Sequence, residues 1–481
     1  MPTSRLSGPD FITAHLGSGL INWDDTVDVI VLGGGLAGLS AALAAAAAGA
    51  QVLLLEKQAN TGGTSALSGG AIAFAGTPIQ ARAGIQDSAA QLLRDLERSS
   101  GGAGSTVLRT LYAEQQLACY QWLCALGVEF SSVQMGSAQS VARSNRVNAQ
   151  AMMDTLAERA REHPLIKIRT QHCAVRLVRT STQSRVCGVV VEHDSRYLAL
   201  QARTGVVLAT GGFARNRSLI HTFAPELDHA CGAGAAGSHG DGLYLATALG
   251  AGLAEMGYLN STFGWFPKAA PEACALLHPI YKGAIAINQQ GLRFCDESAS
   301  YKTLGIACLA QSNGMAYQIF DQRIMDLSVA DAATSNFQGA LTRGEVIAAQ
   351  SLAQLAARIG VEPDTLQTTV DTYNHHINHQ LSDLLGRSSL ANGSGALQTL
   401  NGPVFYAYPS TAAILGTYGG ISVDPQARVL DVFGQPIAQL FAAGELTGGF
   451  HGAGYMTGSA LGQAVIYGRI AGQQAAQQQL S

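Results

Sequence analysis

The stretch DVIVLGGGLAGLSAALAAAA, residues 28–47, decides the fold expected for this chain. A β-branched run typical of a buried parallel strand leads directly into three glycines and then into an Ala-rich segment with the composition of a helix. In such a strand–turn–helix, the first glycine permits the tight turn, the second lets a pyrophosphate approach the backbone, and the third lets helix and strand pack closely. The free N–H groups at the helix start attract phosphate. The residues predicted to contact a dinucleotide here are Gly33, Gly35, Leu36, Ala37 and Gly38.

A second short strand, residues 51–55, follows the helix and ends in an acidic residue. That residue, Glu56, lies about 20 residues beyond the glycines, where a carboxylate accepts hydrogen bonds from a ribose. The strand, the helix and this acid are the context that a GxGxxG motif requires. The loop beyond consists of small residues, and the hydroxyls of Thr64 and Ser68 suit donation to the flavin side of a longer dinucleotide. The contacts predicted in this part are made by Glu56, Lys57, Gly62, Gly63, Thr64, Ser65, Ser68, Gly69 and Gly70.

The length and composition indicate a large α/β protein. The chain has 481 residues, more than a single core usually contains, so two domains are expected. Apolar residues make up 47% and charged residues 13%, a balance that argues against disorder. The net charge is −4 and no basic run is present. We therefore expect no nucleic-acid partner, because nothing would neutralise a phosphate backbone.

Cysteine usage and hydropathy bear on the compartment and the membrane. The eight cysteines are scattered, without a CxxC or a Cys/His cluster at zinc spacing, so no metal site is predicted and reduced thiols are expected. Residues 29–55 carry no charge and are long enough to cross a bilayer, but the adjacent glycines and the second strand favour a buried βαβ unit. Residues 1–25 lack the basic and apolar regions of a signal peptide. We expect a cytoplasmic protein without a transmembrane segment.

Further glycine-containing motifs recur in order along the chain. They are GVVLATGG at 205–212, GDG at 240–242, GLRFCDE at 291–297, LFAAGE at 440–445 and GSALG at 458–462. Together with the N-terminal motifs, this series resembles the fumarate reductase/succinate dehydrogenase flavoprotein family, which includes the ketosteroid dehydrogenases. The resemblance covers nearly the whole chain.

The resemblance implies a Rossmann-type (GR2-like) α/β domain that binds FAD and is built from both chain ends, residues 1–259 and 404–481. It also implies an inserted α+β substrate or capping domain, residues 260–403. The final helix would start near Ser459 and direct its N-terminus at the pyrimidine edge of the flavin, where its dipole stabilises negative charge. Glu445 and Asp241 match positions that hold the ribityl and ribose parts of FAD. The other positions assigned to FAD are Ala174, Val175, Ala209, Thr210, Gly211, Gly212, Gly444 and Leu461.

The same resemblance bears on how FAD is held. Membrane-bound members attach FAD through a His in the loop after the first βαβ unit. The corresponding position here is at or near Gly63, and that loop contains no His. The flavin is therefore expected to be non-covalent.

Three cationic positions of the soluble fumarate reductases are neutral here. Tyr301 stands where their catalytic Arg follows the Gly-x-Arg-Phe motif. The stretch LGTYGG, residues 415–420, replaces their HHTMGG, and GYMTG, residues 454–458, replaces their NRLGG. A site without these charges would leave two carboxylates desolvated and unpaired. Succinate and fumarate are therefore disfavoured as substrates.

The replacements look like those of ketone-oxidising members of the family. Tyr301 follows a Glu-Ser-x-Ser stretch, much as a catalytic Tyr follows Asn-Glu-Ser in 3-ketosteroid dehydrogenases. Tyr455 and Thr457 resemble the Tyr-x-Ser-Gly element of the Δ4-(5α) enzymes, whose Tyr/Ser pair is assigned to proton abstraction. Tyr418, beside a Gly-Gly turn, is a further candidate to face the substrate. We predict that the catalytic residues are Tyr301, Tyr418, Tyr455 and Thr457, and leave open which Tyr is the base and which polarises the carbonyl.

The chemistry of ketone desaturation suits such residues. It removes an α-proton and passes a β-hydride to flavin N5, so it needs a base and a donor to the carbonyl oxygen. The sequence therefore predicts FAD-dependent α,β-dehydrogenation of an apolar cyclic ketone, of the 3-ketosteroid or cyclohexanone kind, with an external electron acceptor. An alternative is an ene reductase that acts on an activated alkene other than a dicarboxylate. A third is a flavin subunit of an electron-transfer complex without a small-molecule site of its own.

Overall fold

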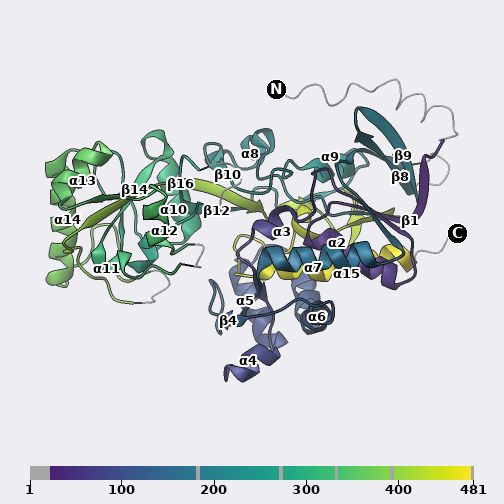
Figure 1. Ribbon diagram of the computed structural model, residues 1–481, viewed down its shortest axis with the longest axis horizontal. Coiled ribbons are helices and arrows are strands. Elements are labelled where there is room, and N and C mark those ends of the chain that lie inside the picture. The colour runs from purple at the N-terminus through teal and green to yellow at the C-terminus, as the bar shows by residue number, and fades with distance from the viewer. Residues whose placement is uncertain (1–21, 180–184, 270–274, 331–333, 391–394, 478–481) are drawn as a thin grey trace. The chain divides into compact units, whose positions relative to one another are not determined.

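The computed structural model describes residues 22–179, 185–269, 275–330, 334–390 and 395–477 (Figure 1). The chain divides into two compact units. The first contains the described parts of residues 1–216, 235–258 and 417–481, and the second contains residues 217–234 and 259–416. The first unit thus combines both ends of the chain. The assignment of residues 260–403 to a substrate or capping domain stays a prediction.

The first unit contains a large, mostly parallel sheet. Its order is β18-β19-β9-β1-β2-β6; β8 also pairs with β9, antiparallel, and β7 pairs antiparallel with β8. In its centre, β1 pairs in parallel with both β2 and β9, so the chain crosses over between them. The strands are β1 (Asp25–Leu32), β2 (Val52–Leu55), β6 (Ile166–Arg169), β7 (Cys173–Arg179), β8 (Val186–His193), β9 (Arg196–Leu208), β18 (Arg428–Leu430) and β19 (Pro436–Ala442).

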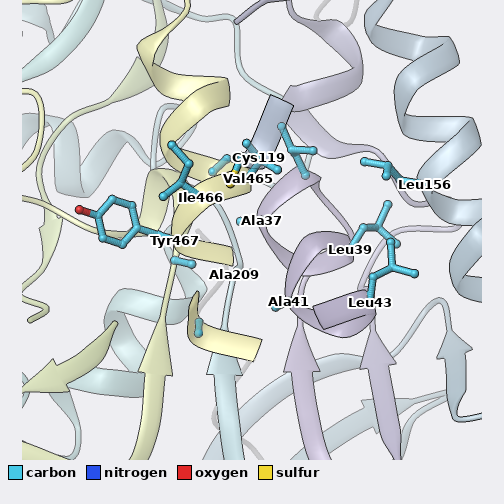
Figure 2. Close-up of a cluster of buried hydrophobic side chains, with 14 of the residues drawn as sticks. Ala37, Leu39, Ala41, Leu43, Cys119, Leu156, Ala209, Val465, Ile466 and Tyr467 are labelled. Carbon is cyan, nitrogen blue, oxygen red and sulfur yellow. The ribbon is translucent and has the colours of Figure 1, made fainter. Parts of the chain in front are cut away.

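Three helices from distant parts of the sequence run alongside one another on this sheet, namely α2 (Leu36–Ala47), α7 (Ala149–Glu162) and α15 (Ser459–Gln477) (Figure 1). Their apolar side chains form one core with the strands, as Figure 2 shows for Leu39, Leu156 and Val465. α15 begins at Ser459, where the sequence predicted it. Burial of apolar surface in such a core is the main stabilising contribution in a domain.

Smaller elements complete the first unit. A three-stranded antiparallel sheet has the order β3-β5-β4, and β11 pairs with β17. These elements are β3 (Ala71–Ala73), β4 (Ser132–Gln134), β5 (Ser144–Arg146), β11 (Leu253–Ala254), β17 (Gly420–Ile421), α3 (Gly63–Leu67), α4 (Pro78–Arg82), α5 (Ala89–Ser99), α6 (Thr106–Ala125), α9 (Asp241–Thr247) and the 3-10 turn η5 (Gly444–Leu446).

The second unit has its own sheet and core. The sheet is centred on β16, which pairs with β10, β12, β14 and β15, while β13 continues beyond β14. Helices pack on it around a core that includes Phe320, Phe337 and Tyr408. The elements are β10 (Cys231–Gly232), β12 (Leu259–Trp265), β13 (Ile285–Ile287), β14 (Ala316–Asp321), β15 (Ile347–Ala349), β16 (Phe405–Thr417), α8 (Arg217–Phe223), α10 (Tyr301–Leu309), α11 (Gln322–Met325), α12 (Phe337–Thr342), α13 (Leu352–Ile359), α14 (Pro363–Asn378), and the 3-10 turns η1 (Pro225–Leu227), η2 (Pro279–Lys282) and η3 (Ser312–Gly314).

The described residues contain neither a helix able to span a membrane nor a cluster of metal ligands. Every helix in the described ranges is too short or too polar to cross a membrane. Among those same residues, no three His, Cys, Asp or Glu side chains gather as a metal site requires.

Candidate functional site

The glycines of the β1–α2 turn differ in what surrounds them. Gly33 has a φ of +107°, which favours glycine, and a Cβ at Gly38 would lie 1.8 Å from the carbonyl oxygen of Gly33. The turn itself therefore requires glycine at both positions. A Cβ at Gly35 would meet nothing closer than 3.8 Å, an ordinary van der Waals distance, so protein atoms do not crowd the backbone there. α2 has no side-chain cap at Gly35 and no acid in its first turn, which leaves a helix N-terminus suited to an anion.

The acid at the end of β2 is held by backbone donors. Glu56 Oε2 accepts the N–H of Gly34 at 2.7 Å, and Oε1 accepts the N–H of Gln58 at 2.8 Å. A carboxylate has further lone pairs, so these bonds orient Glu56 and leave it able to accept from a ribose. Lys57, the next residue, forms an ion pair with Asp241 at 2.5 Å. Asp241 begins α9, so this pair joins two segments that the sequence assigned to FAD.

The small-residue loop folds back onto the same turn. Ser65 Oγ accepts the N–H of Leu36 at 3.2 Å. The hydroxyl of Thr64 lies 3.3 Å from that of Ser238, and the hydroxyl of Ser68 donates to the carbonyl of Ser65 at 2.8 Å. The loop is therefore fixed by its own hydrogen bonds. Donation from Thr64 and Ser68 to FAD stays a prediction, because both hydroxyls already have protein partners.

The motifs at 209–212 and 444–445 meet at a buried carboxyl group. Glu445 accepts the N–H of Thr417 at 3.0 Å, and a Cβ at Gly212 would lie 2.4 Å from Glu445 Oε1. Burial raises the pKa of Glu445 to about 7, against the opposing effect of hydrogen bonds from Thr417 and Gly212. Close by, the buried hydroxyl of Thr210 has no hydrogen-bond partner among the described residues. A proton-bearing carboxyl group and an unpartnered hydroxyl are the groups that a polyhydroxylated ligand would satisfy.

The remaining predicted cofactor residues lie in the same unit. Ala174 and Val175 are in β7, and Gly444 opens the turn that contains Glu445. Ser459 and Leu461 occupy the first turn of α15, where the Ser459 hydroxyl donates to the carbonyl of Met456 at 2.7 Å. Every position that the sequence assigned to the cofactor thus belongs to the first unit. Their location in one unit and the unpartnered hydroxyl of Thr210 fit a dinucleotide such as FAD.

Three aromatic rings gather beside the start of α15. The rings of Tyr418 and Tyr455 are stacked with centroids 6.0 Å apart, and the His451 ring lies 4.9 Å from Tyr418 and 5.7 Å from Tyr455. Burial lowers the pKa of His451 to about 3, so its imidazole is neutral at physiological pH. We call Tyr418, His451 and Tyr455 the ring cluster. The cluster carries no charge at neutral pH.

The phenol of Tyr455 is held at the helix N-terminus. Its oxygen accepts the N–H of Gly458 at 3.1 Å. Burial raises the pKa of Tyr455, while hydrogen bonds from the N–H groups of Gly458 and Ala460 act in the opposite direction. Because burial is the larger effect, the resting phenol keeps its proton. The same N–H groups would stabilise the phenolate once the proton leaves.

Two charged side chains, the buried Arg109 and the partly buried Glu255, bind the loop that carries the cluster. Arg109 donates to the carbonyl of Phe450 at 3.0 Å, and Glu255 accepts the N–H groups of Gly449 and Gly452 at 3.1 and 3.3 Å. These contacts use the backbone of residues 449–452 rather than its side chains. The loop conformation is therefore set independently of any ligand.

Thr457 and Tyr301 are placed differently. Thr457 Oγ1 accepts the N–H of Ser137 at 2.9 Å, so its oxygen is engaged away from Tyr455. Its part in a proton relay with Tyr455 stays a prediction. Tyr301 belongs to the second unit, where it begins α10 after Ser300 caps the helix. Of the four predicted catalytic residues, the structure brings Tyr418 and Tyr455 together in one unit.

Comparison with known proteins decides the family. Residues 28–461 match the family described as FAD binding domain. The chain is a flavoprotein of the fumarate reductase/succinate dehydrogenase family. It is 30% identical over 463 residues to the probable fumarate reductase Ifc3 of Shewanella frigidimarina, which is 95% of this chain and 76% of that protein. The resemblance stated from sequence is thus confirmed, and so is FAD as the cofactor.

Two solved structures show the fold of this flavoprotein. The open form of a flavocytochrome c3 fumarate reductase matches it with a TM-score of 0.87 and 28% identity, over 98% of this chain and 81% of that one. The 3-ketosteroid-Δ4-(5α)-dehydrogenase of Rhodococcus jostii, solved with 4-androstene-3,17-dione, matches with a TM-score of 0.74 and 28% identity, over 95% and 98%. The predicted fold class, a Rossmann-type FAD domain with a capping domain, is confirmed. The flavoprotein is an FAD-dependent oxidoreductase that acts on carbon–carbon bonds.

Sequence reasoning missed a second group of aromatic residues in the second unit. His278 is buried, its Nε2 lies 2.8 Å from the carbonyl of Phe263, and its ring centroid is 4.7 Å from that of Tyr281. Burial lowers the pKa of His278 to about 4. Burial also raises the pKa of Tyr281, and Tyr301 adds to this rise, which places the two phenols near one another. In the sequence, His278 lies in an apolar stretch, and no local pattern distinguishes it from a residue of the hydrophobic core.

A pair of glycine variants would test the FAD site. We expect Gly35→Ala to leave the fold intact but to weaken FAD binding about tenfold or more, because its Cβ meets no protein atom closer than 3.8 Å but would stand where the pyrophosphate is predicted to approach the backbone. Gly38→Ala should instead prevent folding, since its Cβ would overlap the carbonyl of Gly33. FAD titration of the apoprotein with circular dichroism as the control for folding measures both. Unchanged FAD affinity in Gly35→Ala would contradict the assignment.

The buried Glu445 predicts a pH dependence of stability. Its folded pKa of about 7 lies above the ordinary value, so its contribution is fully present below about pH 4.5 and is lost as the pH rises through 7. The apoprotein should therefore lose up to about 3 kcal/mol of unfolding free energy from this group between pH 4.5 and 8. Urea denaturation of the wild type and Glu445→Gln at several pH values measures this. The variant should lack this component, and an identical pH profile in both proteins would refute it.

Proposed function

We propose that this flavoprotein desaturates a cyclic ketone, of the 3-ketosteroid or cyclohexanone kind, at the bond between its α and β carbons. The observation that carries the proposal is the neutral ring cluster of Tyr418, His451 and Tyr455 at the start of α15. A dicarboxylate bound against these rings would lack a countercharge. A ketone needs only an apolar surface and hydrogen bonds, which the rings and phenols supply.

Tyr455 is assigned the movement of the proton. Its oxygen takes the proton from the α-carbon, the electrons of that C–H bond form the new carbon–carbon double bond, and the β-hydrogen leaves as hydride. Bound FAD supplies the acceptor for that hydride. The N–H groups of Gly458 and Ala460 point at the phenol oxygen and stabilise it after its own proton has passed to solvent. An external electron acceptor completes the turnover.

Tyr301 and Tyr418 are assigned supporting parts. Tyr418 stacks on Tyr455 and is buried, so it fixes the plane of that ring. Tyr301 is proposed, on its sequence motif, to donate to the ketone oxygen and so acidify the α-carbon. Its neighbour Lys302 is a cation whose charge interacts with Glu226 of the same unit, and burial lowers the pKa of Lys302.

The reverse reaction, reduction of an activated alkene, is the second candidate. The observation that favours it is the raised pKa of Tyr455, since a phenol that keeps its proton is poised to donate to the α-carbon. The likeness to fumarate reductases points the same way. The same residues and the same bond are used in both directions, so only the substrates and the electron partner differ.

An anaerobic experiment distinguishes these directions. Saturated cyclic ketones of one and of four rings are mixed with the oxidised enzyme, and the flavin absorbance is followed. We expect bleaching with the ketones and no reoxidation of the reduced enzyme by fumarate. If no cyclic ketone bleaches the flavin while viologen-reduced enzyme is reoxidised by an unsaturated ketone, the reductive function holds. Reoxidation by fumarate alone would overturn both.

Removing the phenol oxygen of Tyr455 tests its part in the reaction. We expect Tyr455→Phe to lower kcat for desaturation by about 10²–10⁴-fold, because proton transfer loses its carrier while ring stacking is kept. In the wild type, the desaturation rate should keep rising as the pH increases above neutral, since the pKa of Tyr455 is raised and only the phenolate accepts a proton. Reduction of an alkene should show no such rise.

A matched variant controls for general effects of losing a phenol. Tyr317→Phe removes a hydroxyl that donates to the carbonyl of Ile359 in the second unit. Its kcat and pH profile should match the wild type. A wild-type pH dependence that survives in Tyr455→Phe would show that another group carries the proton.

A further inference from the structure

Residues 136–139 run alongside the loop that follows Tyr455. The N–H of Ser137 donates to Thr457 Oγ1 at 2.9 Å, and the N–H of Thr457 donates to the carbonyl of Ser137 at 3.1 Å. A Cβ at Gly136 would lie 2.5 Å from that of Thr457, so a glycine at this position leaves room for the Thr457 side chain. Two segments 320 residues apart are thus joined by reciprocal hydrogen bonds.

Gln139 completes this junction with its whole carboxamide. Its Nε2 donates to the carbonyl of Thr457 and to the hydroxyl of Ser144, each at 2.8 Å. Its Oε1 accepts the N–H groups of Gly136 at 2.8 Å and Arg143 at 3.2 Å. A carboxamide has two donors and an acceptor oxygen with two lone pairs, so its full capacity is used. Another side chain at this position would leave several of these partners unsatisfied.

The segment that holds Gln139 is itself anchored by buried ion pairs. Arg143 is fully buried and forms two hydrogen bonds of 2.9 Å with Asp87 and one of 2.5 Å with Asp95. The same guanidinium lies 3.9 Å from the sulfur of Met456, the residue between Tyr455 and Thr457. Because separating a buried pair is costly, the segment cannot shift easily. It therefore gives Gln139 a fixed base.

We propose that Gln139 is a positioning residue for Tyr455. Gln139 donates to the carbonyl of Thr457. The N–H of Gly458, which belongs to the same peptide group, donates to the phenol oxygen of Tyr455. A shift of the Thr457 peptide therefore moves the donor that orients the phenol. On the far side, the carbonyl of Gly458 is fixed by the N–H of Ala73 at 3.0 Å. The part of this inference that concerns catalysis rests on the function proposed above for Tyr455.

A double-mutant cycle separates positioning from a merely structural role. In the FAD-loaded enzyme, Gln139→Leu should lower kcat for ketone desaturation about tenfold or more with little change in KM, since small misplacements of a reacting group are costly. In the Tyr455→Phe background the same substitution should cause no further loss, because Gln139 would act through the missing phenol. An equal loss in both backgrounds would overturn the inference.

Hydrogen exchange of the peptide spanning residues 455–460 gives a readout independent of turnover. Exchange should be several-fold faster in Gln139→Leu than in the wild type. Gln150→Leu is the matched control, since Gln150 is exposed in α7 and bonds only Asp154 among the described residues, and exchange should be unchanged. If Gln139→Leu does not fold, Gln139→Glu replaces it, because this side chain keeps the acceptor oxygen and loses donation to Thr457.

The outcomes separate the two proposals. If the wild type desaturates no ketone, the proposed function fails, and the exchange rates alone decide whether Gln139 holds the loop. If the wild type is active but exchange in the Gln139 variants equals that of the wild type, the positioning role is wrong while the proposed function stands.

Discussion

The contact between α2 and α15 is the constraint on which the rest of the first unit depends. A Cβ at Gly468 would lie 2.4 Å from the carbonyl oxygen of Ala37, and one at Gly472 would lie 2.1 Å from that of Ala41. Only glycines in α15 permit this approach, which joins α15 to α2 (Figure 2). Because the same helices begin at Gly35 and Ser459, their packing sets two N-termini at fixed positions. The predicted phosphate and flavin contacts both follow from that geometry.

The second feature is the use of buried charge to shape an uncharged site. Arg109 and Glu255 bind the backbone of residues 449–452, and Arg143 lies against the sulfur of Met456. Arg109 and Arg143 are almost fully buried. Such groups are costly to bury and are tolerated only when fully paired, as here with Glu97, Asp87 and Asp95. Their effect is a loop whose backbone is held by several hydrogen bonds and which carries the neutral rings of His451 and Tyr455. A preorganised loop of this kind holds a reacting group without help from the substrate.

The sequence predicted the parts of this arrangement that are local. The β1–α2 turn and the start of α15 at Ser459 follow from glycines, strand composition and helix signals within a few residues. The ring cluster was partly predicted, because Tyr418 and Tyr455 lie in recognisable motifs. Gln139 and Arg143 could not be found, since their partners are 318 and 48 residues away and no local pattern distinguishes them. Likewise, nothing in residues 217–234 indicates that they join the second unit, because that depends on pairing of β10 with β16.

The family resemblance and the structure together explain how one frame serves opposite directions of the same reaction. A proton carrier at a helix N-terminus experiences two opposed effects: burial favours the neutral phenol of Tyr455, and the N–H groups of Gly458 and Ala460 favour the phenolate. Microscopic reversibility requires that the same oxygen gives the proton in reduction and takes it in oxidation. In the stretch that resembles their NRLGG, the soluble fumarate reductases carry an Arg where this chain carries Tyr455, so the replacement removes a permanent charge beside the start of α15. Under the proposed function, this change in charge, rather than a change in fold, favours a neutral ketone over a dicarboxylate.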